Sequence, residues 1–389
     1  MNPGKDAGKN AGKDALLSAE PSAQLWQALC EGDETRAVAL VRRALAAVGP
    51  AQGTSTGMSA GMSAGTAARE RTRAAGERVL LELIAPAQRR LGLAWAADEI
   101  TVAQEHAATV ISERCIAAVA DSTAPALAGP VLGRVLVSCV GGEWHALPAR
   151  LVSEVLRLRG WRVDHLGAQV PTEHVVAHVR RTRAQAVLLS SSIPTLLPGA
   201  HNAINSCQGE GVRVLAGGAA FGPQGRYARM MRAEWAEDAR GAAALLGRSP
   251  APPVEAARPP DLDLPHLADQ EYTMVCRTRL QLVKQAVADV EEGFPEMRRY
   301  SEYQRERTVE DIDHIVGHLA TALYVNDSDL FTRFIGWTAD VLAARDVPPW
   351  CLLPALDSLL NRLKDFPRAV GILTAARRLL DPPRSTRPI

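Results

Sequence analysis

Hydrophobic residues recur at helical spacing in the first third of the chain. Apolar positions repeat every three or four residues from Glu20 to Val48, from Ala67 to Leu91 and from Ile100 to Val119, which predicts amphipathic helices. Pro86 lies inside the second of these segments and is expected to kink it, because proline cannot donate the helical hydrogen bond. We therefore expect a bundle of three or four helices over residues 19–121.

Local signals refine this bundle. Thr101 and Gln104 have the spacing of a capping box, so the third helix is expected to begin there. Trp95 is expected in a turn that follows Gly92. Residues 1–18 and the Gly-Met-Ser-Ala repeat of Gly49 to Thr66 predict a disordered tail and a flexible insertion.

Between residues 131 and 248 the pattern alternates between short apolar runs and amphipathic segments. The predicted strands are Arg134–Val140, Trp161–Leu166, Ala186–Ser191, Val212–Ala216 and a weak fifth near Ala233–Ala236. The predicted helices are Ala149–Arg159, Thr172–Thr182 and Gly199–Gln208. This alternation predicts a flavodoxin-like, doubly wound parallel sheet with right-handed crossovers.

A proline-rich linker over residues 249–265 precedes a third region, 266–382, that is helical throughout. About six helices are expected there, one of them capped by Asp327. The fold class is thus α/β plus all-α, with a helical bundle, a parallel sheet and a C-terminal helical domain.

Composition excludes several classes of protein. The formal net charge is +1 and 22% of the 389 residues are charged, so nothing indicates a nucleic-acid or membrane partner. The six cysteines are scattered without disulfide-like or CxxC spacing, and no signal peptide or membrane-length apolar run is present. We expect a soluble, cytoplasmic protein.

The loop after the first predicted strand carries the candidate chemistry. Glu143 and His145 stand at the carboxyl edge of the sheet, where ligands of open α/β sheets bind. A neutral imidazole can reach the cobalt of a cobalamin from below, and a carboxylate can hold its far nitrogen. His145 is therefore predicted to be the lower axial ligand.

Small residues and hydroxyls follow the next strands at the same edge, as a slot for a nucleotide tail requires. They are Ser190, Ser192, Leu197, Gly217 and Gly218.

These three segments, Glu143-x-His145, Ser190-x-Ser192-x4-Leu197 and Gly217-Gly218, resemble the signature of cobalamin-binding domains in methionine synthase, corrinoid methyltransferases and CarH-type light sensors. Pro148 stands where that signature usually has glycine. The histidines outside these motifs, His165, His174, His178 and His201, are taken as structural or exposed.

The helical region resembles the CarH-type photoreceptors more closely, through Trp95-x9-Glu105-His106. This resemblance implies that the bundle covers the upper face of adenosylcobalamin, with Trp95 packed on the adenosyl group and Glu105 and His106 beside it. The best-known members carry a second histidine after the tryptophan, and Ala96 takes its place here. After photolysis, His106 or water would then be left to occupy the upper axial position of the cobalt.

The third region resembles, in architecture, the second domain of the photocobilins, which is helical, globin-like and binds biliverdin. Candidate bilin contacts are Asp313, His314, His318, Tyr324 and Arg333. Other arginines that suit propionates are Arg277, Arg279, Arg298 and Arg299. Haem binding, a dimerisation domain without ligand, and a thioether to Cys276 or Cys351 are the alternatives.

The sequence as a whole predicts a light sensor that uses adenosylcobalamin and biliverdin and carries no output enzyme. We expect it to signal through a light-dependent homo-oligomer or a separate signalling partner. Direct DNA binding is not expected, because no winged DNA-binding segment precedes the bundle. The alternatives are a corrinoid carrier for a methyltransferase and a cobalamin-responsive binding protein that does not use light.

Overall fold

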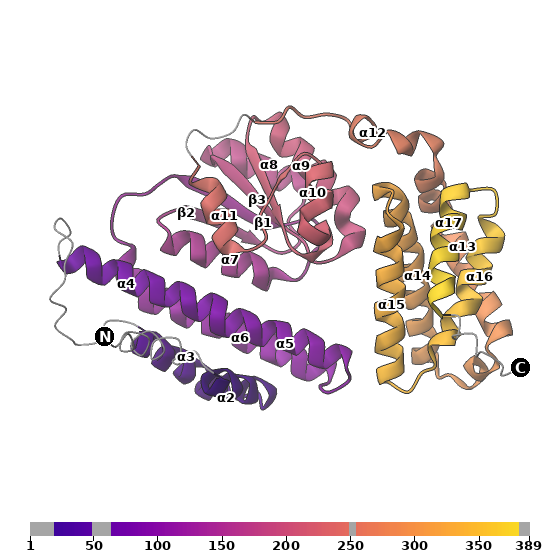
Figure 1. Ribbon diagram of the computed structural model, residues 1–389, viewed down its shortest axis with the longest axis horizontal. Coiled ribbons are helices and arrows are strands. Elements are labelled where there is room, and N and C mark those ends of the chain that lie inside the picture. The colour runs from indigo at the N-terminus through magenta and orange to yellow at the C-terminus, as the bar shows by residue number, and fades with distance from the viewer. Residues whose placement is uncertain (1–18, 49–63, 249–253, 381–389) are drawn as a thin grey trace, which may run out of the picture. The chain divides into compact units, whose positions relative to one another are not determined.

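The computed structural model describes residues 19–48, 64–248 and 254–380 (Figure 1). The predicted tail, most of the predicted insertion and the start of the linker lie outside these residues. The chain forms two compact units. Of the described residues, the first unit holds 19–48, 64–139, 144–190 and 236–248, and the second holds 140–143, 191–235 and 254–380.

The first predicted helix is in fact two helices, α2 (Ala19–Cys30) and α3 (Glu34–Val48). The prediction of one continuous helix was wrong because the chain turns at Gly32, whose φ of +70° lies in the left-handed region that favours glycine. Asp33 then accepts a hydrogen bond from the Arg36 amide at 2.9 Å and so starts the second helix.

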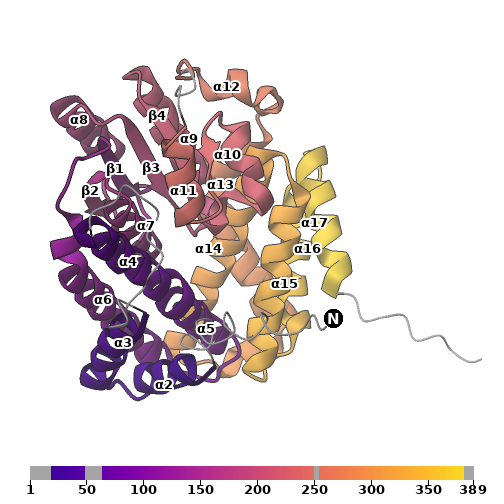
Figure 2. The ribbon, with the colours of Figure 1, turned by 60° about the vertical axis from the view of Figure 1, so that its left-hand side comes forward.

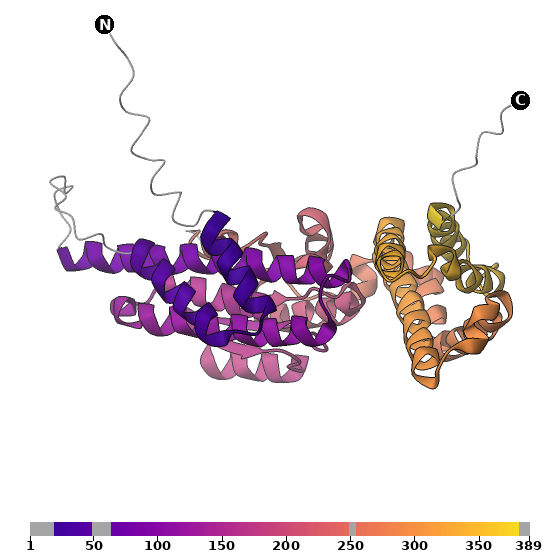
Figure 3. The same cartoon turned by 90° about the horizontal axis from the view of Figure 1, so that it is seen from below.

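The second predicted helix runs without interruption from residue 64 to 96, and Figure 3 shows it from below among the other helices of the bundle. It comprises α4 (Ala64–Arg78), a π-helical segment η2 (Val79–Ile84) and α5 (Ala85–Ala96). Pro86 is the second residue after the π-helical segment, so the expected distortion takes the form of a π turn. Residues 64–66, predicted as insertion, are helical, and Trp95 lies in the last turn of α5 rather than in a loop.

Helix α6 (Val102–Thr123) begins where the capping box predicted. The side chain of Thr101 accepts from the Gln104 amide at 3.2 Å, and Gln104 accepts from the Thr101 amide at 2.9 Å. One apolar core joins the bundle to helix α7 (Ala146–Leu158). Its buried members include Leu25, Leu29, Leu80, Leu83, Ile84, Leu91, Ile116, Leu147 and Leu158.

The predicted parallel sheet is confirmed and has the strand order β2-β1-β3-β4-β5 (Figure 2). Its strands are β1 (Arg134–Cys139), β2 (Arg162–Gly167), β3 (Ala186–Ser190), β4 (Arg213–Gly217) and β5 (Glu234–Trp235). The connecting helices are α7, α8 (Thr172–Thr182), α9 (Leu197–Gly209), α10 (Arg226–Met230) and α11 (Ala239–Leu246). Because all strands run the same way, their carboxyl ends share one edge of the sheet.

The C-terminal region is helical, as predicted, although it has five long helices in the described residues instead of about six. These are α13 (Glu271–Gly293), α14 (Glu302–Val325), α15 (Ser328–Ala344), α16 (Leu353–Arg362) and α17 (Pro367–Leu380). A short helix, α12 (Pro260–Asp263), lies within the predicted linker. Asp327 caps α15 as expected, accepting from the Asp329 amide at 3.0 Å.

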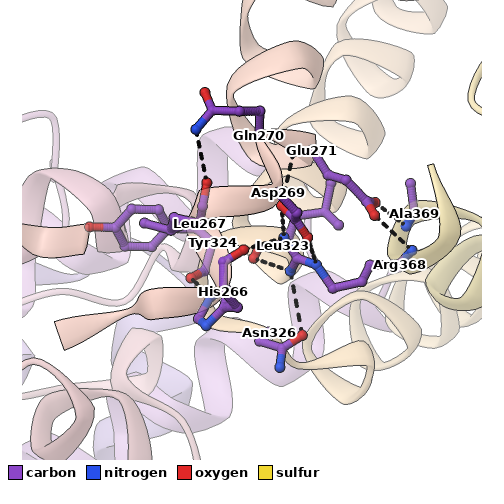
Figure 4. A network of polar contacts seen from close by, with 10 residues as sticks. All are labelled: His266, Leu267, Asp269, Gln270, Glu271, Leu323, Tyr324, Asn326, Arg368 and Ala369. Carbon is purple, nitrogen blue, oxygen red and sulfur yellow. Dashed lines mark hydrogen bonds and ion pairs between the residues drawn. The ribbon is translucent and has the colours of Figure 1, made fainter. Parts of the chain in front are cut away.

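A polar network fixes the start of α17 (Figure 4). Glu271 accepts hydrogen bonds from the amides of Arg368 and Ala369, at 3.0 and 2.8 Å. The Arg368 guanidinium donates to Asp269 and to the Leu323 carbonyl oxygen at the end of α14. Three helices, α13, α14 and α17, are thus joined at one corner. Across the described part of the chain, no helix is both long and apolar enough to cross a bilayer.

A carboxylate in α4 connects the bundle to two helices of the sheet region within the first unit. Glu77 accepts from Arg159, after α7, at 2.6 and 2.8 Å and from Arg240 of α11 at 2.9 Å. The side chain of Glu77 is only 11% exposed, while Arg159 and Arg240 are 46% and 43% exposed, so these charge-assisted bonds are shielded from water on the carboxylate side only. Hydrogen bonding by Arg159 holds the pKa of Glu77 below its ordinary value.

We expect Glu77→Gln to lower the free energy of unfolding by about 1–3 kcal/mol, the usual cost of weakening a buried charge-assisted pair. Since the folded-state pKa of Glu77 is depressed, its contribution is present above the unfolded-state value and is lost as the pH falls through the folded one. Urea unfolding across acidic pH measures both effects. Glu70→Gln, on an exposed position of α4, is the control; equal losses from both variants would contradict the assignment.

Candidate functional site

The loop between β1 and α7 presents the predicted axial ligand. Gly142 has a φ of +87°, which lets the chain turn sharply after the strand. His145 is the N-cap residue of α7, so the helix begins three residues earlier than predicted. Pro148 therefore lies in the first helical turn, where a backbone N–H has no intrahelical acceptor and proline is tolerated.

The imidazole of His145 is exposed, and so is the neighbouring indole of Trp144. The two ring centroids are 5.3 Å apart and the planes are tilted by 41°. The Cys139 thiol donates to the His145 carbonyl oxygen at 3.8 Å, which ties the loop to the end of β1. An accessible imidazole nitrogen on a fixed backbone is a suitable donor for cobalt.

Glu143 is completely buried, and its Oε2 atom accepts three hydrogen bonds. The donors are the Ser191 hydroxyl at 3.1 Å, the Ser192 amide at 2.6 Å and the Ile193 amide at 3.1 Å. Three donors satisfy a carboxylate oxygen that is removed from water. The predicted hydrogen bond from His145 to Glu143 stays a prediction.

Sequence reasoning missed Ser191 while naming its neighbours Ser190 and Ser192. The Ser191 side chain is 1% exposed and faces Glu143, whereas Ser190 and Ser192 are half-buried. The sequence carries no signal that singles out Ser191, because the burial of Glu143, which requires a nearby hydroxyl or amide, becomes visible only in the fold.

Gly217 ends β4 and Gly218 follows it, and both lie against the backbone of Ser191. Gly218 has a φ of +102°, and a Cβ atom there would lie 2.2 Å from the Ser191 carbonyl oxygen. The Ser191 amide donates to the Gly217 carbonyl oxygen, and the Ser191 carbonyl oxygen accepts from the Ala220 amide, both at 3.1 Å. Leu197 is fully buried at the start of α9 and belongs to the core.

The predicted capping residues lie on two adjoining helices of the first unit. Trp95, in the last turn of α5, is half-buried against the bundle core. Glu105 and His106 lie in the first turns of α6, with His106 Nδ1 at 3.0 Å from Glu105 Oε2. Glu105 also accepts from Thr109 at 2.9 Å, and Gln88 of α5 donates to Thr109 at 2.7 Å. These bonds fix Glu105, while the His106 side chain is 75% exposed.

Of the five predicted bilin contacts, His314 and His318 are joined to each other, since His318 Nδ1 lies 2.8 Å from the His314 carbonyl oxygen. Asp313 pairs with Arg279, His314 is exposed, and Arg333 donates to the Asp329 carbonyl oxygen.

His318 lies stacked on Phe334 with ring centroids 3.5 Å apart, and burial lowers its pKa to about 4. Tyr324 is buried and its hydroxyl bonds to His201.

Of the four histidines predicted to be structural or exposed, one is buried, two are half-buried and one is exposed. His165 contacts the Ser153 hydroxyl at 2.9 Å, and burial lowers its pKa to about 4. His178 pairs with Asp164 at 3.0 Å, and His174 is exposed. His201 is fully buried, and its bonds extend beyond the sheet region, as described below.

Two families match this chain, each described as a B12 binding domain. One covers residues 133–244, the parallel sheet and its helices. The other covers residues 22–119, the helical bundle. Two regions of the chain thus match B12-binding domains. The resemblance to cobalamin-binding domains is confirmed at this level, and cobalamin binding is supported.

The chain is similar to two kinds of curated protein. It is 33% identical over 91 residues to the HTH-type transcriptional repressor CarA of Myxococcus xanthus, covering 23% of this chain and 31% of that protein. It is 30% identical over 92 residues to Dimethylamine corrinoid protein 1 of Methanosarcina acetivorans, covering 23% of this chain and 43% of that protein. The matched part is therefore less than half the length of either relative.

Among solved structures, the Methanosarcina barkeri monomethylamine corrinoid protein aligns with a TM-score of 0.43 and 20% identity. The alignment covers 58% of this chain and 96% of that protein.

We expect Gly218→Ala to destabilise the protein by about 2 kcal/mol or more, because the strained φ and the approach to Ser191 act together. Thermal unfolding of the full chain measures this. Gly199→Ala is the control, since Gly199 lies in α9 with open space around its Cα, and alanine there should be neutral or stabilising by up to about 1 kcal/mol. Similar melting temperatures for both variants would refute the close approach.

Proposed function

We propose that the protein is a light sensor that binds adenosylcobalamin through its B12-binding domains. The observation that supports this best is the arrangement of Trp95, Glu105 and His106 on α5 and α6, at the two sides of one short turn. A protein that only carries a corrinoid needs no such indole and acid–imidazole pair on its helical domain.

In this proposal each residue has a physical task. His145 offers a nitrogen to cobalt from the N-cap of α7, and Glu143, held by three donors, keeps the loop in place. Trp95 covers the apolar face of the upper group, and Glu105, fixed by Thr109, accepts hydrogen bonds at its edge. When bound, adenosylcobalamin supplies a cobalt–carbon bond that light can break.

Loss of the upper group would remove a packing partner from Trp95. The adjacent π-helical segment offers a place where α5 can bend, since its hydrogen bonds are irregular. We propose that this motion changes the homo-oligomeric state or the affinity for a separate signalling partner. Direct DNA binding, membrane attachment and an enzymatic output form no part of the proposal.

We further propose that the C-terminal helices bind biliverdin, which would extend the absorption to longer wavelengths. Support comes from the helical architecture and from the residues near α14, including the stacked pair His318 and Phe334. Arg279 and Arg333 are the candidate partners for propionates, and Asp313 and His314 for pyrrole nitrogens.

A corrinoid carrier for a methyltransferase is the second candidate. It is favoured by the similarity to the dimethylamine corrinoid proteins of Methanosarcina, which is as strong as the similarity to CarA. The two functions make opposite demands on the helical domain: a carrier must expose the upper face of the corrin to partner enzymes, and a sensor must enclose it.

We expect the protein purified in the dark with adenosylcobalamin and biliverdin to change its corrin spectrum and its mass after green light. Absorption spectra and light scattering before and after illumination provide the measurement, with methylcobalamin as the comparison ligand. Spectral change without any change in mass or hydrodynamic radius would favour the carrier or a cobalamin-responsive protein that does not use light. Absence of a far-red band would exclude biliverdin.

We expect His145→Ala to remove the absorption of imidazole-ligated cobalamin while the chain stays folded. The control is His174→Ala, at an exposed position of α8, which should leave the spectrum unchanged. If the imidazole-ligated spectrum persists in His145→Ala, another residue is the ligand.

A further inference from the structure

A short stretch of the second unit, residues 191–201, contacts both the loop before His145 and the C-terminal helices. Its first three residues supply all three hydrogen bonds to Glu143 Oε2. Glu143 is buried and stands two residues before His145 along the chain. A displacement of this carboxylate would leave the Ser192 and Ile193 amides without this acceptor, while the Ser191 hydroxyl also lies 3.4 Å from the Ile193 carbonyl oxygen.

The middle of the stretch, η4 (Pro194–Leu196), packs against α14. It also touches the loop, because a Cβ atom added to Gly142 would lie only 3.1 Å from Leu196 Cδ2. This one turn of helix is therefore confined between the loop and a long C-terminal helix.

The end of the stretch is held by a buried polar cluster. His201, in α9, is completely buried, and its Nδ1 lies 2.9 Å from the Tyr324 hydroxyl at the end of α14. Its Nε2 lies 3.2 Å from Asp263 Oδ2 of α12. Nearby, the Tyr227 hydroxyl donates to Asp327 at 2.5 Å, directly after α14. Because these side chains are buried and hydrogen-bonded, we expect a movement of α9 to shift α14 as well.

We propose that residues 191–201 couple the His145 loop to α14, so that the C-terminal helices respond to what binds at His145. The response to cobalamin rests on the proposed function of His145, whereas the coupling between Glu143 and α14 is a property of the chain alone. Coupling of this kind gives the C-terminal helices a way to report the state of the corrin without touching it.

The first test needs no ligand. Ser191→Ala removes a side-chain donor to Glu143 Oε2, and we expect amide hydrogen exchange in residues 302–325 of the full-length apoprotein to become roughly tenfold faster. Ser192→Ala is a matched control, because Ser192 uses its backbone amide and alanine retains it. Exchange in α14 that is equally slow in both variants would overturn the coupling.

The second test adds hydroxocobalamin. In the wild type we expect its binding to change exchange in residues 302–325, and in Tyr324→Phe we expect this change to fall severalfold while the cobalt spectrum stays the same. Tyr303→Phe is the control, since Tyr303 lies on the same helix with its ring exposed. An undiminished response in Tyr324→Phe, or none in the wild type with ligand bound, contradicts the proposal.

The two tests separate the hypotheses. If hydroxocobalamin fails to bind but Ser191→Ala still accelerates exchange in α14, the cobalamin function is wrong and the coupling stands. If hydroxocobalamin binds with an imidazole-ligated spectrum and neither test alters α14, the cobalamin function stands and the coupling is wrong.

Discussion

A buried carboxylate imposes the strongest local constraint on this protein. Removing Glu143 from water is costly unless every lone pair that loses water gains a donor. Ser191, Ser192 and Ile193 provide those donors from the segment after β3. The ends of β1 and β3 are thereby locked together, and the loop that presents His145 gains a rigid base.

The same constraint explains why glycine follows β4. The Ser191 hydroxyl donates to Glu143, and the Ser191 carbonyl group lies so close to Gly218 that no Cβ atom fits there. The small residues of the cobalamin signature therefore act partly as scaffold, in addition to any role beside a nucleotide tail. The burial of Glu143 thus constrains which residues can stand in the loops after β1, β3 and β4.

Sequence reasoning succeeded where a local interaction decides the structure. The Thr101–Gln104 capping box, the Asp327 cap and the apolar strands each depend on neighbouring residues and were predicted correctly. It failed where distant contacts decide. Ser191 could not be distinguished from its two serine neighbours until Glu143 was seen to face it, and Gly32 was not recognised as a helix end because the apolar pattern continues across it.

The π-helical segment Val79–Ile84 has a consequence for how this helical domain can vary. A π turn accommodates one residue more than an α turn, so deleting one residue there would restore a regular helix. The π turn takes up the additional residue locally, so the residues of α5 keep the faces that they would have in a regular helix one residue shorter. The direction in which Trp95 faces therefore tolerates loss of one residue within Val79–Ile84, whereas a deletion between Ala85 and Trp95 would turn the indole by about 100° relative to α4.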